Sequence, residues 1–316
     1  MNAHVPPQMV SLAEFPESTL TSPGMKVLPA DLTPRRPIAA LLGVPYATKS
    51  GQELHLQIIL PPMPPLEPPD FLPAARYPLV VYVQGSAWLK QELGLSLPGL
   101  VEVARRGYVV AIVEYRPSTV APFPAQVRDV ATAIRFLRRE AGRFGIDVSR
   151  IALWGDSSGG HTTLLTYLTE GDQGFSDEPL DQAEPLGIGC FVDYYGPTDI
   201  GRMQEEPSIQ DHGGADSPEG LLIGGVVLAE HPELVAPTVA LNHLRAGQAL
   251  KPLLMIHGSK DRIVPFGQSV RLHQALVAAG QLVEFYQLAG ADHGGAPFWT
   301  DQVLDLVDEF IRRHLG

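Results

Sequence analysis

The chain has 316 residues, of which 45% are hydrophobic and 18% are charged. It is therefore long enough for one large domain or two average ones, with ample material for a core. The formal net charge of −12 argues against nucleic acid or an anionic membrane surface as a partner. A single cysteine, Cys190, excludes an intramolecular disulfide. Because we find neither a secretory signal nor the ~18 consecutive apolar residues of a membrane span, we expect a cytoplasmic protein.

The first residues differ in pattern from those that follow. Residues 1–36 are rich in Pro, Ser and Thr and show no sustained period, which predicts an N-terminal arm. In residues 52–62, QELHLQIILPP, apolar side chains alternate with polar ones. This alternation predicts a strand, paired antiparallel with the segment before it. We expect residues 37–316 to form a single domain.

From residue 77 onward, short apolar runs alternate with segments of helical period. The runs are apolar on both faces, which is typical of parallel strands covered on both sides. They occupy residues 77–85, 108–115, 150–155, 186–196, 251–258 and 281–290. Strands that alternate with helices predict right-handed crossovers. The sequence therefore predicts an α/β fold, with helices on both faces of a mostly parallel twisted sheet.

Three segments have the period of an amphipathic helix: residues 124–145, residues 266–280 and the segment from about Thr300. The residues expected to face inward are Val127, Val130, Ile134 and Leu137 in the first, Val270, Leu272, Leu276 and Val277 in the second, and Val303, Val307 and Phe310 in the third. Gly280 marks the end of the second helix. These helices cover the sheet.

Residues 199–250 separate the sixth and seventh core strands. About 50 residues are too many for an ordinary connection, so we expect an insertion with short helices. Ligands of open α/β sheets bind at the carboxyl ends of the strands, which is where this segment begins and ends. It is predicted to be a lid-like insertion.

Residues 155–159, Gly-Asp-Ser-Ser-Gly, stand between a buried strand and a helical pattern. A G-x-S-x-G sequence in this position is typical of a nucleophile elbow, a turn so tight that its flanking positions must lack a Cβ. Ser157 is two residues from each glycine, whereas Asp156 lies two residues before Ser158. Ser157 is therefore the predicted nucleophile, and Ser158 supplies the backbone N–H that follows it.

A serine hydroxyl needs a base to take its proton. Two histidines stand in nearly identical text, His212 in QDHGGADS and His293 in GADHGGAP. His293 follows the last predicted strand, at the carboxyl edge of the sheet, and is the predicted base. His212 comes before the strand that would carry the acid, so we interpret it as a surface or lid residue. For His161 and His257 we expect structural roles.

The base must be oriented by an acid. Asp261 lies in the loop that follows the run KPLLMIHG, at the same edge of the sheet, and is the predicted acid. Asp199 is the second choice, although the N-cap of a short helix suits it better. Asp292 adjoins His293, and sequence neighbours rarely aim a carboxylate at the ring nitrogen.

A second donor for an oxyanion is expected in the loop after residues 77–83. Gly85 lets the backbone turn its amides toward the elbow, so Gly85 and Ser86 join Ser158 as the predicted oxyanion hole. An ordinary Gly-Ser turn is the alternative. Trp88 and Tyr195 are the predicted wall of the substrate pocket, although aromatic residues there are as often part of a core.

With these fragments in order, the chain resembles α/β-hydrolase-fold serine esterases. It is most similar to the bacterial acetyl-esterase and feruloyl-esterase-like group, which is related to hormone-sensitive lipases and kynurenine formamidases. The resemblance rests on VYVQGSAW, FGIDVSRIALWGDSSGGH, SPEGLLIGG, PLLMIHGSKDRIVP and ADHGG, and covers roughly residues 40–315. It implies a triad of Ser157, Asp261 and His293, and neither a metal nor an organic cofactor.

The chain departs from this group in one place. The group usually has His-Gly-Gly before the small residue and the tryptophan, whereas this chain has Gln84, Gly85, Ser86 and Ala87 before Trp88. The departure leaves the triad prediction alone. It concerns the geometry of the oxyanion hole, where Ser86 either strains the turn or offers its hydroxyl as an extra donor.

The hypothesis is hydrolysis of a small-molecule ester with a short acyl group, acetyl or feruloyl by the resemblance, through an acyl-enzyme. An amidase, arylformamidase or peptidase with the same triad is the alternative. A hydrolase-fold binding protein without activity is a third reading, which the presence of all three triad residues disfavours. The expected partner is the ester substrate, with neither nucleic acid nor a membrane span, and a homodimer is left open.

Overall fold

The structure is a computed structural model that describes residues 14–29, 38–62, 75–179, 181 and 183–316. The chain divides into two compact units, residues 1–35 and residues 36–316. Much of the predicted N-terminal arm, and part of the boundary after residue 36, lie outside the described residues. The second unit carries the sheet, the helices and every candidate site residue.

An eight-stranded sheet forms the centre of the second unit, in the order β1-β2-β4-β3-β5-β6-β7-β8. The strand β2 pairs antiparallel with β1 and β4, and all other pairs are parallel. The strands are β1 Ala39–Lys49, β2 Gln52–Leu60, β3 Tyr77–Val83, β4 Val109–Val113, β5 Ile146–Asp156, β6 Ile188–Tyr194, β7 Leu253–Gly258 and β8 Val283–Leu288. The predicted α/β fold and the predicted strands are confirmed.

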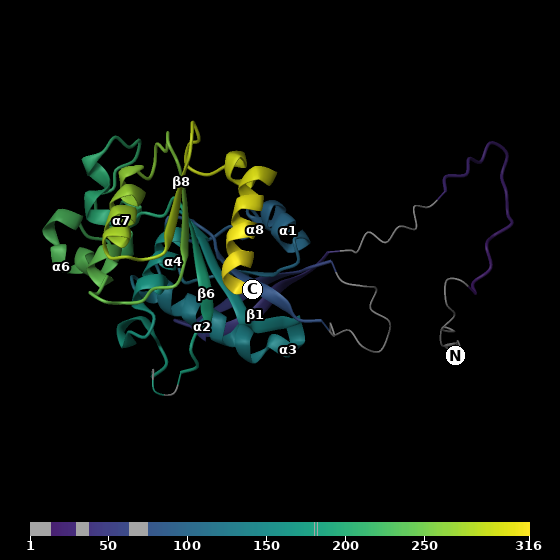
Figure 1. Cartoon of the computed structure of the whole chain (residues 1–316), viewed down its shortest axis with the longest axis horizontal. Helices are drawn as coiled ribbons and strands as arrows, with labels where there is room; N and C mark the ends of the chain where they lie inside the picture. The colour runs from purple at the N-terminus through teal and green to yellow at the C-terminus, as the bar shows by residue number, and fades with distance from the viewer. Residues whose placement is uncertain (1–13, 30–37, 63–74, 180, 182) are drawn as a thin grey trace. The chain divides into compact units, whose positions relative to one another are not determined.

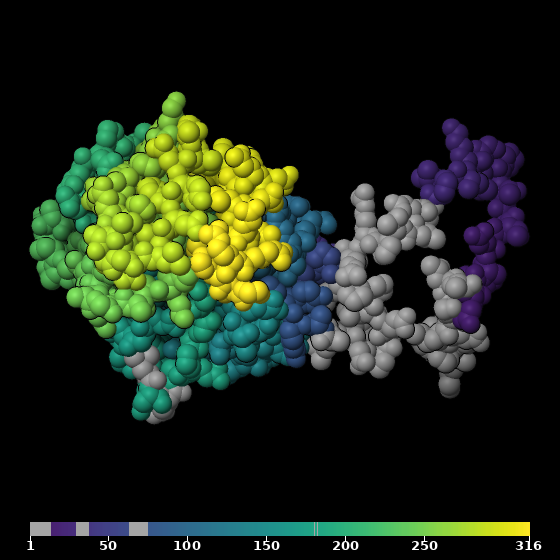
Figure 2. Space-filling model, viewed as in Figure 1, coloured from purple at the N-terminus to yellow at the C-terminus, as the bar shows by residue number. Residues whose placement is uncertain are grey.

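Helices cover both faces of this sheet (Figure 1). The main helices are α1 Leu97–Arg105, α2 Ala125–Arg139, α4 Ser158–Thr169, α7 Gly267–Ala278 and α8 Asp301–Leu315, and a short α3 spans Ala141–Phe144. One core cluster joins the sheet to α2, α4 and α7. A second cluster on the opposite face joins it to α1 and α8. Figure 2 shows α8, in yellow, on the surface of the domain.

The predicted apolar faces of α2 and α8 are confirmed, because every residue expected to face inward there is buried. The prediction for α7 is wrong in part. Leu272 and Leu276 are buried, but Val277 is 53% exposed. Gln268 lies inside instead, where its side-chain oxygen accepts hydrogen bonds from the amides of Thr198 and Asp199. The helix is rotated so that it anchors the segment after β6.

Short helical turns fill the segment between β6 and β7. They are η2 Ile200–Glu205, α5 Pro218–Leu222, η3 Leu228–Glu230, α6 Pro232–Val235, η4 Ala236–Thr238 and η5 Ala240–His243. Among the described residues, these turns have an apolar cluster of their own, which includes Ile200, Leu222 and Val239. Trp88 belongs to the same cluster. This insertion is therefore packed onto the loop after β3, and its role as a lid stays a prediction.

Candidate active site

The turn between β5 and α4 holds Ser157 in a conformation that side chains rarely adopt, with φ 52° and ψ −126°. The two flanking glycines make this turn sterically feasible. A Cβ on Gly155 would lie 2.2 Å from the carbonyl oxygen of Gly159, and a Cβ on Gly159 would lie 1.9 Å from that of Val83. Any larger residue would force the strand and helix apart. The turn places Ser157 directly before the first residue of α4, at the positive end of that helix.

Three side chains from three separate loops form a continuous series of hydrogen bonds. Ser157 Oγ lies 2.9 Å from His293 Nε2, and His293 Nδ1 lies 2.7 Å from Asp261 Oδ2. Because a carboxylate only accepts, the Nδ1–H of His293 donates to Asp261. Nε2 is then free to accept the hydroxyl proton of Ser157. The structure thus brings together the three residues predicted as nucleophile, base and acid, and their catalytic roles stay predictions.

Asp261 is held in place by four donors. Its Oδ1 accepts from the amides of Ile263 and Val264, at 2.9 and 2.8 Å. Its Oδ2 accepts from His293 and, at 3.2 Å, from Nε2 of His257. Burial of the carboxyl opposes ionisation, but the hydrogen bonds from both histidines outweigh it and lower the pKa of Asp261 to about 2. Asp261 is therefore a carboxylate at any pH near neutrality.

The other candidate residues do not join this series. His257 is buried in the core, as predicted, and also orients Asp261. His161 accepts from the indole N–H of Trp88 at 3.1 Å. Asp199 caps η2 by accepting from Gly201 N. Asp292 accepts from the amide and the guanidinium of Arg262.

His212 belongs to a second cluster, inside the insertion. Of the two interpretations of His212, that of a surface residue is wrong, because its side chain is only 1% exposed, and that of a lid residue stays a prediction. Its Nδ1 lies 2.8 Å from Glu219 Oε1, and its Nε2 lies 2.8 Å from Ser208 Oγ and 3.0 Å from the carbonyl oxygen of Ile263. His212 therefore attaches the insertion to the loop that carries Asp261.

The backbone amides of the loop after β3 are already engaged at two of the predicted positions. The N–H of Gly85 donates to Asp156 Oδ1 at 2.9 Å, and that of Ser86 donates to Ser158 Oγ at 2.9 Å. The amides of Ala87 and Ser158 donate to no group among the described residues. Sequence reasoning thus missed Ala87, whose positive φ of 57° depends on how the loop closes.

A pocket of about 520 Å³ opens over Ser157 and His293. Its walls come from the loop after β3, the segment after β6, the insertion and the loop before α8. The lining residues include Tyr82, Ser96, Tyr195, Gln210, Ile263 and Trp299. Tyr195 lies where it was predicted, with its ring centroid 4.7 Å from that of His293. Trp88 does not line this pocket, since it is 2% exposed and packs into the apolar cluster of the insertion.

Asp156 is a functional candidate that sequence reasoning passed over as a mere neighbour of the nucleophile. Its Oδ1 accepts from the hydroxyl of Tyr82 at 2.7 Å and from the amide of Gly85. Burial raises the pKa of Asp156, against the opposing hydrogen bonds from Tyr82 and Gly85. The aspartate thus ties the loop after β3 to the elbow. Its position inside the G-x-S-x-G sequence was the available signal.

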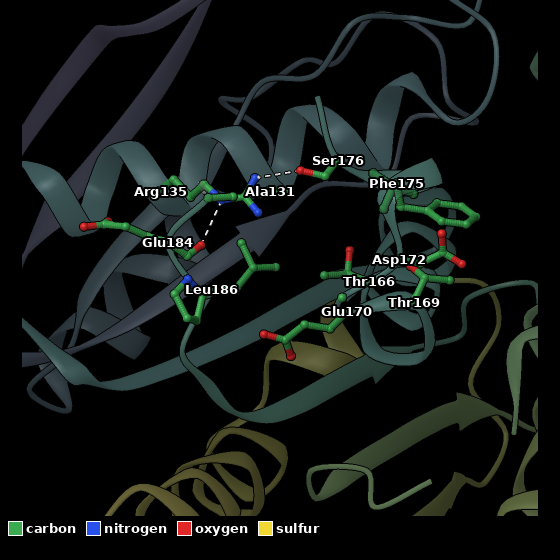
Figure 3. A pocket seen from close by; sticks show the side chains of 14 residues that line it. Ala131, Arg135, Thr166, Thr169, Glu170, Asp172, Phe175, Ser176, Glu184 and Leu186 are labelled. Atoms are coloured by element: carbon green, nitrogen blue, oxygen red, sulfur yellow. Dashed lines mark hydrogen bonds between the residues drawn. The ribbon is translucent and has the colours of Figure 1, made fainter. Parts of the chain in front are cut away.

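Another pocket, of about 340 Å³, lies between α2 and the segment after α4 (Figure 3). None of its lining residues is among those that line the pocket over Ser157. Its buried Arg135 donates to the carbonyl oxygen of Glu184 at 3.0 Å and to Ser176 Oγ at 3.3 Å. These bonds hold the segment after α4 against α2, so this arginine has a structural use.

Within the described residues, no group of three or more His, Cys, Asp or Glu side chains is arranged to hold a metal ion. None of the helices formed by these residues combines the length and apolar character needed to cross a membrane.

A mostly parallel sheet, a serine on a strand–helix elbow and a histidine after the last strand define an α/β hydrolase. The model of the BD-FAE family matches residues 71–276, a stretch that holds Ser157 and Asp261 and ends before His293. The chain therefore belongs to the BD-FAE family, and its resemblance to α/β-hydrolase esterases is confirmed.

Esterases recur among the similar proteins. Esterase LipC of Mycobacterium tuberculosis is 28% identical over 71% of this chain and 54% of its own length. Esterase LipQ of the same organism is 25% identical over 88% of this chain and 63% of its own length. The chain thus spans little more than half of the length of these relatives. A truncated carbohydrate esterase from gut microbiota has a TM-score of 0.72 and 26% identity, covering 88% of this chain and 96% of the other.

Proposed function

We propose that the protein hydrolyses carboxylic esters with short acyl groups through an acyl-enzyme on Ser157. The observation that carries this proposal is the series of hydrogen bonds from Ser157 through His293 to Asp261, at 2.9 and 2.7 Å, on the floor of an open pocket. The esterase relatives support the same reaction type.

The proposed reaction has two acyl transfers. His293 Nε2 takes the proton of Ser157 as Oγ attacks the ester carbonyl, and the amides of Ser158 and Ala87 stabilise the oxyanion. The imidazolium then gives that proton to the departing alcohol, which leaves an acyl group on Ser157. A water molecule attacks the acyl-enzyme, again with His293 as base. Asp261 keeps Nδ1 protonated and stabilises the imidazolium throughout.

The pocket favours a neutral, polar alcohol group. Its lining residues include Ser96, Gln210 and Trp299, and Asp156 is the one carboxyl group among them. The name of the gut carbohydrate esterase supports acylated sugars as the first class to test. Acetyl and feruloyl esters are the acyl groups that we propose.

The test is a comparison of wild type with Ser157→Ala. We expect wild type to hydrolyse p-nitrophenyl acetate faster than the octanoate, and to react with a fluorophosphonate probe. Ser157→Ala should lose at least about 10⁴-fold in kcat and all labelling, as removal of a serine nucleophile does elsewhere. Ser208→Ala is the matched control, because it removes a serine that also contacts a histidine, and it should keep both properties.

Ethyl ferulate, N-formylkynurenine and an aminoacyl anilide complete the substrate panel. Faster turnover of the formamide or the anilide than of any ester would replace the esterase proposal with the amidase alternative. Wild type that neither labels nor hydrolyses any member of the panel would contradict an active site at Ser157.

A further inference from the structure

The loop after β3 has an unusual backbone. Residues Ala87 and Trp88 both have positive φ, 57° and 56°, a region that residues other than glycine rarely adopt because it is strained for them. Such a conformation persists only where the surroundings hold it. The loop also carries the free amide of Ala87, so whatever holds it controls an oxyanion donor of the proposed reaction.

Three hydroxyl groups connect this loop to its surroundings: that of Ser86, which is half-buried, and those of Tyr115 and Ser158, which are buried. Ser86 Oγ lies 2.7 Å from the carbonyl oxygen of Leu89 and 2.8 Å from the hydroxyl of Tyr115. The hydroxyl of Tyr115 lies 3.4 Å from Ser158 Oγ, which accepts the amide N–H of Ser86 at 2.9 Å. The amide and the hydroxyl of Ser86 are therefore connected to each other through the hydroxyls of Ser158 and Tyr115.

The direction of each hydroxyl donor follows from this arrangement. A carbonyl oxygen only accepts, so the hydroxyl of Ser86 donates to Leu89. Tyr115 then donates to Ser86 Oγ at 2.8 Å, its contact with the carbonyl oxygen of Gln84 being longer at 3.4 Å, and Ser158 is left to donate to Tyr115. Tyr115 is 1% exposed, and burial raises its pKa to about 12, so its hydroxyl keeps its proton in the working range.

We propose that Tyr115 is a positioning residue of the oxyanion hole, acting through the hydroxyls of Ser86 and Ser158. Its hydroxyl touches no reacting atom. By holding Ser86, it keeps the Ser86 amide on Ser158 Oγ and the next amide, that of Ala87, turned to the site. The inference rests on the proposed function of Ser157, and it explains how a chain with Ser86 at a family glycine position builds this hole.

The test is Tyr115→Phe, which removes one oxygen and keeps the ring. A misplaced loop weakens stabilisation of the oxyanion and leaves binding of the ground state alone. Loss of a whole donor costs about 10²–10³ in kcat, so we expect a loss of about 10- to 100-fold in kcat, with KM within about twofold. Tyr108→Phe is the matched control: its buried hydroxyl donates to Asp308 at 2.6 Å, away from the site, and its kcat should stay at the wild-type value.

A second readout separates positioning from a structural role. Sulfur is a poor hydrogen-bond acceptor, so the ratio of kcat/KM for p-nitrophenyl acetate to that for its thionoester reports on the oxyanion donors. We expect this ratio to fall by about fivefold or more in Tyr115→Phe and to stay unchanged in Tyr108→Phe. Damage that merely lowers the active fraction would reduce both rates together and leave the ratio unchanged.

Ser86→Ala supplies an independent variant in a more accessible position. It should lower the oxoester-to-thionoester ratio in the same direction. An unchanged ratio in soluble Tyr115→Phe, or in Ser86→Ala where the tyrosine variant does not fold, would overturn the inference. The proposed function is tested apart from it, because that proposal fails only if wild type is inactive or Ser157→Ala remains active.

Discussion

Among the described residues, two of the serine–histidine–carboxylate clusters have nearly the same hydrogen-bond distances. In the first, Ser157 Oγ is 2.9 Å from His293, which is 2.7 Å from Asp261. In the second, both distances, from Ser208 Oγ to His212 and from His212 to Glu219, are 2.8 Å. Even the sequence around the two histidines is alike, DHGGA in both. Distance and residue type therefore do not distinguish them.

What differs is the backbone and the access of solvent. Ser157 stands on a strained elbow before α4 and lines an open pocket. Ser208 lies in an irregular segment after η2, and its hydroxyl contacts the carbonyl oxygens of Arg262 and Ile263. The hydroxyl of Ser208 therefore has two carbonyl oxygens as acceptors for its proton besides His212. Two short hydrogen bonds are therefore not enough to make a serine a nucleophile. It also needs a base that is free to take its proton, a helix N-terminus beside it and room for a substrate.

The largest difference should come from neutralising the two carboxylates. Asp261→Asn removes the charge that fixes the His293 tautomer, and the equivalent change in other serine hydrolases lowers kcat by about 10⁴. We expect a comparable loss in kcat for p-nitrophenyl acetate. Glu219→Gln, the matched change in the second cluster, should leave kcat within about threefold. Equal losses in both variants would mean that the second cluster takes part in the chemistry.

A smaller effect should appear in stability rather than in rate. Glu219→Gln weakens a buried, charge-assisted hydrogen bond to His212, and such bonds are worth about 1.5–3 kcal/mol. Urea denaturation should show a lower free energy of unfolding by about that amount. An unchanged midpoint and slope of the urea denaturation curve would show that the stability of the domain does not depend on the hydrogen bond between His212 and Glu219.

The smallest expected effect is on the pH dependence of stability. Burial opposes the charging of His212, but the hydrogen bond that His212 donates to Glu219, with a smaller contribution from Asp211, raises the pKa of His212 above the ordinary value. A raised pKa in the folded protein means stabilisation that is complete below the unfolded pKa of about 6.5 and is lost as the pH rises through the folded value. The stability gap between wild type and His212→Gln should therefore narrow between pH 5.5 and 8.5. A gap that widens with pH would contradict this sign.

Much of the fold and of the candidate site could be predicted because the signals are local. The alternation of apolar runs and helical periods is confirmed in every predicted strand, and the elbow sequence is a steric requirement of one turn. Val277 shows the limit of periodicity. Leu276 is one helical turn after Leu272 and shares its buried face, whereas Val277 is turned a further ~100° around the helix, toward solvent, and Gln268 is buried instead.

The oxyanion loop shows a second limit. Gly85 was predicted to be an oxyanion donor because a glycine backbone turns easily, yet its amide donates to Asp156. Among the described residues, the amide of Ala87 donates to no group. Trp88 was expected to line the substrate pocket, but its side chain packs in the apolar cluster of the insertion. Each of these outcomes depends on a partner that is distant in the sequence.

By itself the sequence determined the strand–turn–helix around Ser157, the order of nucleophile, acid and base, and the strands that carry them, because steric limits and side-chain periods act between close neighbours. Only the tertiary structure decided that the amides of Gly85 and Ser86 are already engaged and that Trp88 packs into the apolar cluster of the insertion. Those outcomes arise because chain segments that are distant in the sequence meet at one edge of the sheet and offer hydrogen-bond partners that local patterns do not reveal.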